Sequence, residues 1–121
     1  MFHAEVDSSK RVLTMSFAKH VDSPEMKSCL ETVRSILVDV EPGFRVLTDL
    51  TSLDSMDAHC SRHLGEIMSL CDAKGIKAAV RVVPDPKKDI GFTILDPFHH
   101  GKHVEVMTYE TLADAIQSLS T

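Results

Sequence analysis

The segment Phe44-Arg-Val-Leu-Thr-Asp-Leu-Thr-Ser-Leu-Asp-Ser-Met-Asp-Ala-His-Cys60 determines the fold that we predict for this chain. It contains an apolar run, Val46 to Leu50, which is broken only by Thr48 and Asp49 and is typical of a central strand covered on both faces. A short acidic turn then leads into an amphipathic helix, for which Asp57 is the expected N-terminal cap. Strand, turn and helix in this order are typical of α/β proteins, which display functional residues at such turns.

The 121-residue chain has an ordinary globular composition, with 43% hydrophobic and 26% charged residues. This length suits one domain, residues 1–121, that buries about two-thirds of the surface of the unfolded chain. The net charge of −5 and the scattered Lys and Arg residues argue against nucleic acid as a partner. The longest apolar run is only a few residues, so the pattern predicts neither a transmembrane segment nor a secretion signal. We therefore expect a soluble, cytoplasmic protein.

Before this segment, the pattern predicts a β-hairpin and a long helix. Apolar and polar residues alternate from Phe2 to Asp7 and from Leu13 to Phe17, on both sides of a polar turn. Ser23 is the expected cap of a helix from about Pro24 to Val40, which Pro42-Gly43 ends. The apolar stripe of this helix consists of Met26, Cys29, Leu30, Val33, Ile36, Leu37 and Val40.

After this segment, helices and strands continue to alternate. The second helix is expected to end at Lys74-Gly75, and Ala78 to Val83 is the next strand. A shorter helix from Lys87 to about Leu95 precedes the strand Val104 to Met107, and Thr108 is the expected cap of the last helix. The order predicts an α/β fold with a mixed, mostly parallel sheet of about five strands, about four helices and an N-terminal β-hairpin.

The element order, the length and the turn Leu50-Thr-Ser-Leu-Asp-Ser-Met-Asp57 resemble the STAS domains of bacterial anti-sigma-factor antagonists. The chain is more closely similar to a SpoIIAA-like group of small bacterial proteins, as the segment Arg81 to Gly91 also indicates. The resemblance implies a non-enzymatic protein-interaction or regulatory domain that binds a protein partner or itself. In that family a serine at the turn is phosphorylated by a partner kinase, which releases or captures an anti-sigma factor.

The phosphoacceptor serine of the family is missing from this chain. Asp57 matches the family aspartate, but Ala58 occupies the serine position, and His59 and Cys60 replace the residues that follow. Alanine has no oxygen to carry a phosphate group, so the resemblance implies an interaction surface without the phosphorylation switch. That partner-binding surface is expected to consist of Asp57, Ala58, His59 and Arg62.

Hydroxyl and thiol groups near the turn allow two interpretations each. Ser55 and Ser61 could be modified, although serine at a helix start is more often a cap. Cys60 beside His59 could be a reactive thiol, because the helix dipole favours a thiolate. No glycine-rich phosphate loop, recognisable Ser-His-Asp arrangement or close cysteine pair indicates a reaction. We interpret all three cysteines as reduced core residues: Cys29, Cys60 and Cys71.

The seven histidines raise the question of a metal site. His59 and His63 lie four residues apart on one side of the second helix, close to Cys60. A second cluster consists of His99, His100 and His103. Neither spacing matches a recurring zinc motif, and polar histidines on a helix start and a loop explain both clusters. We therefore predict no metal site and no cofactor.

An alternative function is a carrier of a small apolar or lipid-like ligand. The SpoIIAA-like fold is similar to the lipid-binding Sec14 architecture. A groove between the third helix and the sheet would be lined by Phe92, Ile94, Leu95 and Phe98. The other interpretation of these side chains is ordinary packing over the edge of the sheet.

Overall fold

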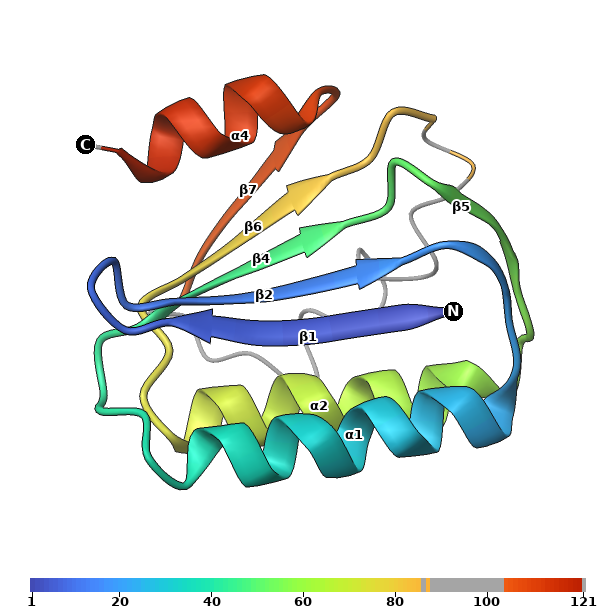
Figure 1. Ribbon diagram of the computed structural model, residues 1–121, viewed down its shortest axis with the longest axis horizontal. Coiled ribbons are helices and arrows are strands. Elements are labelled where there is room, and N and C mark those ends of the chain that lie inside the picture. The colour runs from blue at the N-terminus through green and yellow to red at the C-terminus, as the bar shows by residue number, and fades with distance from the viewer. Residues whose placement is uncertain (86, 88–103, 121) are drawn as a thin grey trace.

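A five-stranded sheet in the order β1-β2-β4-β6-β7 forms the centre of the computed structural model, which describes residues 1–85, 87 and 104–120 (Figure 1). Strand β1 is antiparallel to β2, and every other neighbouring pair is parallel. This confirms the predicted mixed, mostly parallel sheet of five strands. The bounds are Phe2–Asp7 for β1, Val12–Phe17 for β2, Arg45–Asp49 for β4, Ala78–Val82 for β6 and Glu105–Tyr109 for β7.

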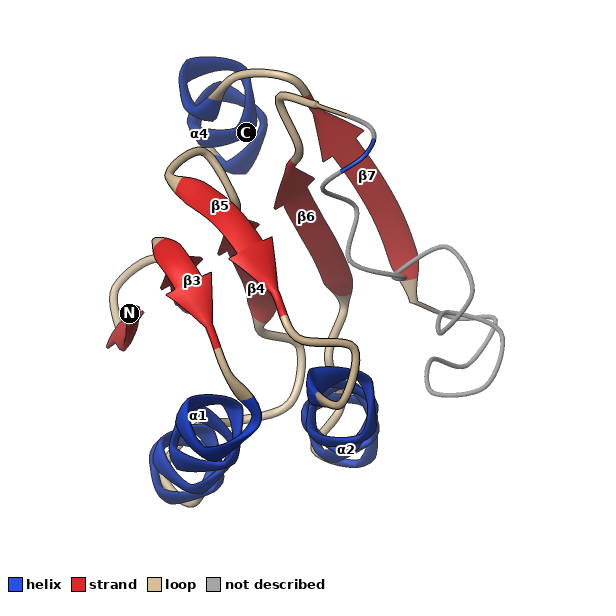
Figure 2. Ribbon diagram, turned by 90° about the vertical axis from the view of Figure 1, so that its right-hand side faces the viewer, coloured by secondary structure: helices blue, strands red, loops and turns tan. Residues whose placement is uncertain are grey.

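Helices cover both faces of this sheet. Figure 2 shows α1 (Ser23–Leu37) and α2 (Cys60–Ala73) side by side under one face, and α4 (Leu112–Leu119) over the other. The main core lies between the sheet and the pair α1 and α2, and it buries the predicted residues Leu30, Val33 and Leu37. A smaller core lies under α4 and includes Leu47 and Ala115.

Helix α1 differs from the prediction at both ends. Asp22, not Ser23, is the cap, because its carboxylate accepts a hydrogen bond of 2.9 Å from the backbone N–H of Glu25. The helix ends at Leu37, where the following hydrogen bonds span three residues, as in the bond of 3.3 Å from the Val40 N–H to the Leu37 carbonyl. The last turn is therefore tightened rather than α-helical.

The other predicted elements within the described residues are present, but the caps predicted for the two later helices are not the observed ones. Helix α2 ends before Lys74, and Gly75 follows with φ +94, as the Lys74-Gly75 signal indicated. Helix α4 is capped by Thr111, whose hydroxyl accepts a bond of 3.2 Å from the Asp114 N–H. The predicted cap, Thr108, instead lies within β7, where it pairs with β6. The helix predicted for 87–95 falls outside the described residues after Lys87.

Two short strands were not predicted. Strand β3 (Lys19–Val21) pairs in parallel with β5 (Leu53–Met56) to form a second, two-stranded sheet. Figure 2 shows that β3 leads into α1 and that β5 leads into α2. The acidic turn expected between β4 and α2 is therefore partly a strand.

None of the helices in the described ranges combines the length and the hydrophobicity that crossing a membrane requires.

Truncation of Leu37 to alanine tests the buried stripe of α1. Leu37 is 5% exposed in the main core, so Leu37→Ala should lower the free energy of unfolding by about 2 to 5 kcal/mol through lost burial and a cavity. Urea unfolding followed by circular dichroism measures this change. The matched control is Val38→Ala, because Val38 is 72% exposed and should change stability by less than about 0.5 kcal/mol. A loss below about 1 kcal/mol for Leu37→Ala would contradict the assigned core.

Candidate functional site

The chain turns from β5 into α2 at the surface of the molecule. The Asp57 N–H donates a hydrogen bond of 3.0 Å to the Val21 carbonyl oxygen, which extends the pairing of β3 and β5. The N–H groups of Cys60 and Ser61 then donate to the carbonyl oxygens of Asp57 and Ala58, at 3.0 and 3.2 Å. Backbone carbonyls therefore close this turn, and α2 starts without a side-chain cap.

Asp57 is not the helix cap that the sequence predicted. Its carboxylate instead lies 3.1 Å from Nε2 of His20, on the neighbouring strand β3. The physical reason is that the first N–H groups of α2 already bond to backbone carbonyls, which leaves the Asp57 side chain able to pair with the imidazole.

The predicted contact residues Ala58, His59 and Arg62 are all exposed. Nε of Arg62 lies 3.6 Å from a carboxylate oxygen of Glu66, one turn later in the helix. The Arg62 side chain is 85% exposed, so this ion pair contributes little to the stability of the fold, and Arg62 can reach a partner. The first turn of α2 contains no acidic residue, so no side chain of that turn compensates the positive end of the helix dipole, and the carboxylate of Asp57, just before the helix, pairs with His20. A shallow hollow between the starts of α1 and α2 is lined by Ser23, Pro24, Ala58, His59, Ser61, Arg62 and His63.

Cys60 is a buried thiol, as we interpreted it. Its side chain is fully buried, with Sγ 3.6 Å from the Val21 carbonyl oxygen. Burial raises the pKa of Cys60, and the negative charge of Asp57 raises it further, so the thiolate is disfavoured. Burial likewise raises the pKa of Cys29 and of Cys71 to about 12. Core packing therefore accounts for all three cysteines.

Because Cys60 points into the core, it does not form a metal site together with His59 and His63. Across the described ranges, no three side chains of His, Cys, Asp or Glu come together as metal ligands would. The other histidine cluster, His99, His100 and His103, lies outside the described residues.

The structure brings together one cluster that the sequence analysis missed. His20 on β3 lies between two residues of the turn, with Nδ1 2.7 Å from Ser55 Oγ and Nε2 3.1 Å from Asp57 Oδ1. In the parallel register His20 is the direct partner of Ser55. His20 is 35 residues from Ser55 in sequence, and only the pairing of β3 with β5 makes them neighbours. No local motif could therefore have indicated this Ser-His-Asp cluster.

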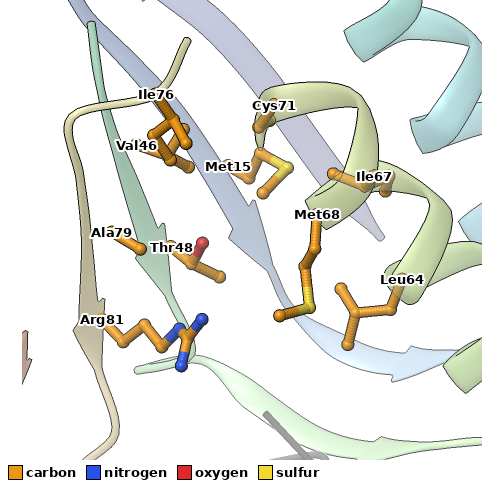
Figure 3. A pocket seen from close by; sticks show the side chains of 10 residues that line it. All are labelled: Met15, Val46, Thr48, Leu64, Ile67, Met68, Cys71, Ile76, Ala79 and Arg81. Carbon is orange, nitrogen blue, oxygen red and sulfur yellow. The ribbon is translucent and has the colours of Figure 1, made fainter. Parts of the chain in front are cut away.

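The residues proposed for an apolar groove, Phe92, Ile94, Leu95 and Phe98, lie outside the described residues. A hollow in the described part lies between α2 and the sheet (Figure 3). Its lining is mainly apolar, but the buried side chains of Thr48 and Arg81 also face it. The volume of about 20 Å³ leaves room for about one water molecule.

No family model matches the sequence, and no curated protein matches it either. Solved structures do match over almost the whole chain. An uncharacterised protein of the DUF3478 family from Shewanella loihica PV-4, described as having a SpoIIAA-like fold, superposes with a TM-score of 0.71 at 17% identity, covering 98% of this chain and 93% of that one.

Two structures of SpoIIAA also match. The unphosphorylated anti-sigma-factor antagonist has a TM-score of 0.64 at 16% identity, covering 99% of this chain and 98% of that one. The phosphorylated form of the Bacillus protein has a TM-score of 0.64 at 14% identity, covering 98% and 99%. Structural matches at such low sequence identity demonstrate a shared fold and not a shared activity. This protein therefore has the SpoIIAA-like, STAS-type fold of the anti-sigma-factor antagonists.

Proposed function

We propose that this protein is a non-enzymatic regulatory domain that binds a protein partner through the start of α2 and the turn before it. The observation that carries this proposal is the exposure of Ala58, His59 and Arg62 at the N-terminal end of α2. The resemblance to the antagonist family supports it, because that resemblance matches Ala58 to the position of the regulatory serine. The step from fold to function is an analogy, which the experiments below test directly.

The charge of this surface indicates the kind of partner. The first turn of α2 carries Arg62 and His63 without an acidic side chain, and His59 precedes it. The nearby carboxylate of Asp57 is paired with His20. Helix α1 starts differently, since Asp22 caps it and Glu25 lies in its first turn. A partner that presents carboxylates to the start of α2 would gain from the helix dipole and from the arginine. The proposed contact face of the partner is therefore acidic.

Charge reversal at the start of α2 tests this surface. The double variant His59→Glu, Arg62→Glu should lose binding of the partner at least tenfold, because two carboxylates would then face an acidic surface. Affinity capture with the full chain identifies binding proteins, and titration calorimetry with the purified candidate measures the dissociation constant. Both positions are exposed, so circular dichroism of the variant should match that of the wild type.

The matched control is the double variant Arg34→Glu, Ser35→Glu near the C-terminal end of α1. Both control residues are exposed, and the substitutions lower the formal charge by the same amount. The control should bind the partner as the wild type does. Equal binding by the wild type and the His59→Glu, Arg62→Glu variant would remove this surface from the proposed function.

The missing hydroxyl at position 58 predicts that a serine kinase of a partner-switching system leaves the turn unmodified. Ala58 offers no acceptor oxygen, so phosphopeptide mapping should find no phosphate on residues 53–61 of the wild type. Ala58→Ser restores an exposed hydroxyl at the same place and serves as the control for access by the kinase. Stoichiometric phosphate on Ser55 or Ser61 of the wild type, with loss of partner binding, would contradict the prediction.

A second candidate function is the carriage of a small apolar or lipid-like ligand. The hollow of Figure 3 supports it, because an apolar lining with a few buried polar groups, here Thr48 and Arg81, is typical of ligand sites. Its volume of about 20 Å³ is far below the roughly 300 Å³ of small ligand pockets, so a ligand would have to displace side chains. Native mass spectrometry after gentle purification should then show a stoichiometric adduct. A bare protein mass would count against the carrier and leave the protein-binding proposal unaffected.

A further inference from the structure

A serine, a histidine and an aspartate, the side chains that together activate a serine nucleophile, meet on the surface beside α2. Ser55 Oγ lies 2.7 Å from Nδ1 of His20, within hydrogen-bonding distance. The other ring nitrogen, Nε2, lies 3.1 Å from the carboxylate of Asp57. A hydroxyl beside a base that a third group orients is the arrangement that activates serine.

We propose that Ser55 is an acyl-accepting nucleophile, with His20 as its general base and Asp57 as the residue that positions His20. The proposal concerns stoichiometric modification of Ser55 and not enzymatic turnover. It is independent of the proposed partner surface, because its test needs no partner protein.

Backbone hydrogen bonds hold the three residues together. The parallel register pairs His20 with Ser55 and Val21 with Met56. On either side, the Lys19 N–H donates to the Ser52 carbonyl at 2.9 Å, and the Asp57 N–H donates to the Val21 carbonyl at 3.0 Å. The relative position of base and nucleophile is thus set by paired strands rather than by side-chain contacts alone.

The carboxylate of Asp57 selects the useful form of His20. An ionised carboxylate only accepts hydrogen bonds, so Nε2 of His20 carries the proton that points to it. In this neutral tautomer the remaining nitrogen, Nδ1, is an acceptor, and the Ser55 hydroxyl at 2.7 Å is placed to donate to it. Nδ1 is therefore the nitrogen that can receive the serine proton.

These three residues and the acyl donor account for every bond and proton in the acylation step. The Ser55 oxygen attacks the carbonyl carbon of the donor and forms the new C–O bond while its proton moves to Nδ1 of His20. Asp57 stabilises the resulting imidazolium through Nε2–H. When the tetrahedral intermediate collapses, the bond to the leaving group breaks, and that group takes the proton from Nδ1. The products are the ester of Ser55 and the free thiol or phenol.

Solvent exposure indicates the class of acyl donor. The side chains of His20 and Asp57 are 52% and 46% exposed, so a donor reaches the cluster without any opening of the core. Water also screens the cluster and weakens its stabilisation of charge. The donor must therefore carry a good leaving group, as the thiolate of a thioester or the phenolate of an aryl ester is.

Acetylation by p-nitrophenyl acetate tests the proposal, with peptide mass spectrometry to locate the acetyl group. Ser55 should be acetylated at least tenfold faster than Ser9, a matched internal control. Ser9 is also exposed, and its hydroxyl donates a bond of 2.7 Å to the Asp7 carboxylate rather than to a histidine. Equal rates at Ser55 and Ser9 would overturn the proposal.

Variants separate the roles of the other two residues. His20→Gln keeps a polar side chain at an exposed position of β3 but removes the base, so the rate at Ser55 should fall at least tenfold. Asp57→Asn should lower the rate, and Asp57→Glu, which restores a carboxylate, should recover it. Circular dichroism and urea unfolding show whether each variant is folded. A folded His20→Gln variant with an unchanged rate at Ser55 would overturn the assignment of His20 as the base.

Discussion

Burial of β4 between β2 and β6 is the constraint on which the rest of the structure depends. Successive side chains of a strand point to opposite faces, so a central strand must be covered on both. Val46 points into the main core under α1 and α2, whereas Leu47 points into the smaller core under α4. Arg45 adds a direct link, since its guanidinium donates a bond of 3.0 Å to the Leu119 carbonyl at the end of α4. The helix–sheet–helix layers follow from this requirement.

The pairing of β3 with β5 has a different role, because it organises a surface rather than a core. It aligns the chain entering α1 with the chain entering α2, so both helices start on the same side of the molecule (Figure 2). The same pairing places His20 against Ser55 and Asp57. Side chains from two distant segments thus form one exposed region. Beneath it, Cys60 lies in the core, with its Sγ near the Val21 carbonyl oxygen.

Position 58, at the start of α2, carries an alanine and therefore no hydroxyl group. A phosphate at the start of α2 would add roughly −1.5 to −2 charges next to the positive end of the helix dipole. With Ala58 there, the charged side chains at that helix start include Arg62 and the preceding Asp57. In the proposed function the interaction is therefore constitutive unless another chemical group alters this surface. Ser55, held by His20 on the neighbouring strand, is the hydroxyl whose chemistry would provide one.

Local patterns were sufficient to predict the elements of the main sheet and the stripe of α1 that contains Leu37, because burial enforces a periodicity visible in the sequence. They were insufficient at helix starts, where Asp22 and Thr111 cap in place of the predicted Ser23 and Thr108. Several polar residues near such a boundary can serve as caps, and the exact end of the preceding element selects one of them. The exposure of the turn was predictable, since Ala58 and its neighbours precede an amphipathic helix. The cluster around His20 was decided only by tertiary structure, because a three-residue strand has too little periodicity to reveal its partner and 35 residues separate the histidine from the serine that it contacts.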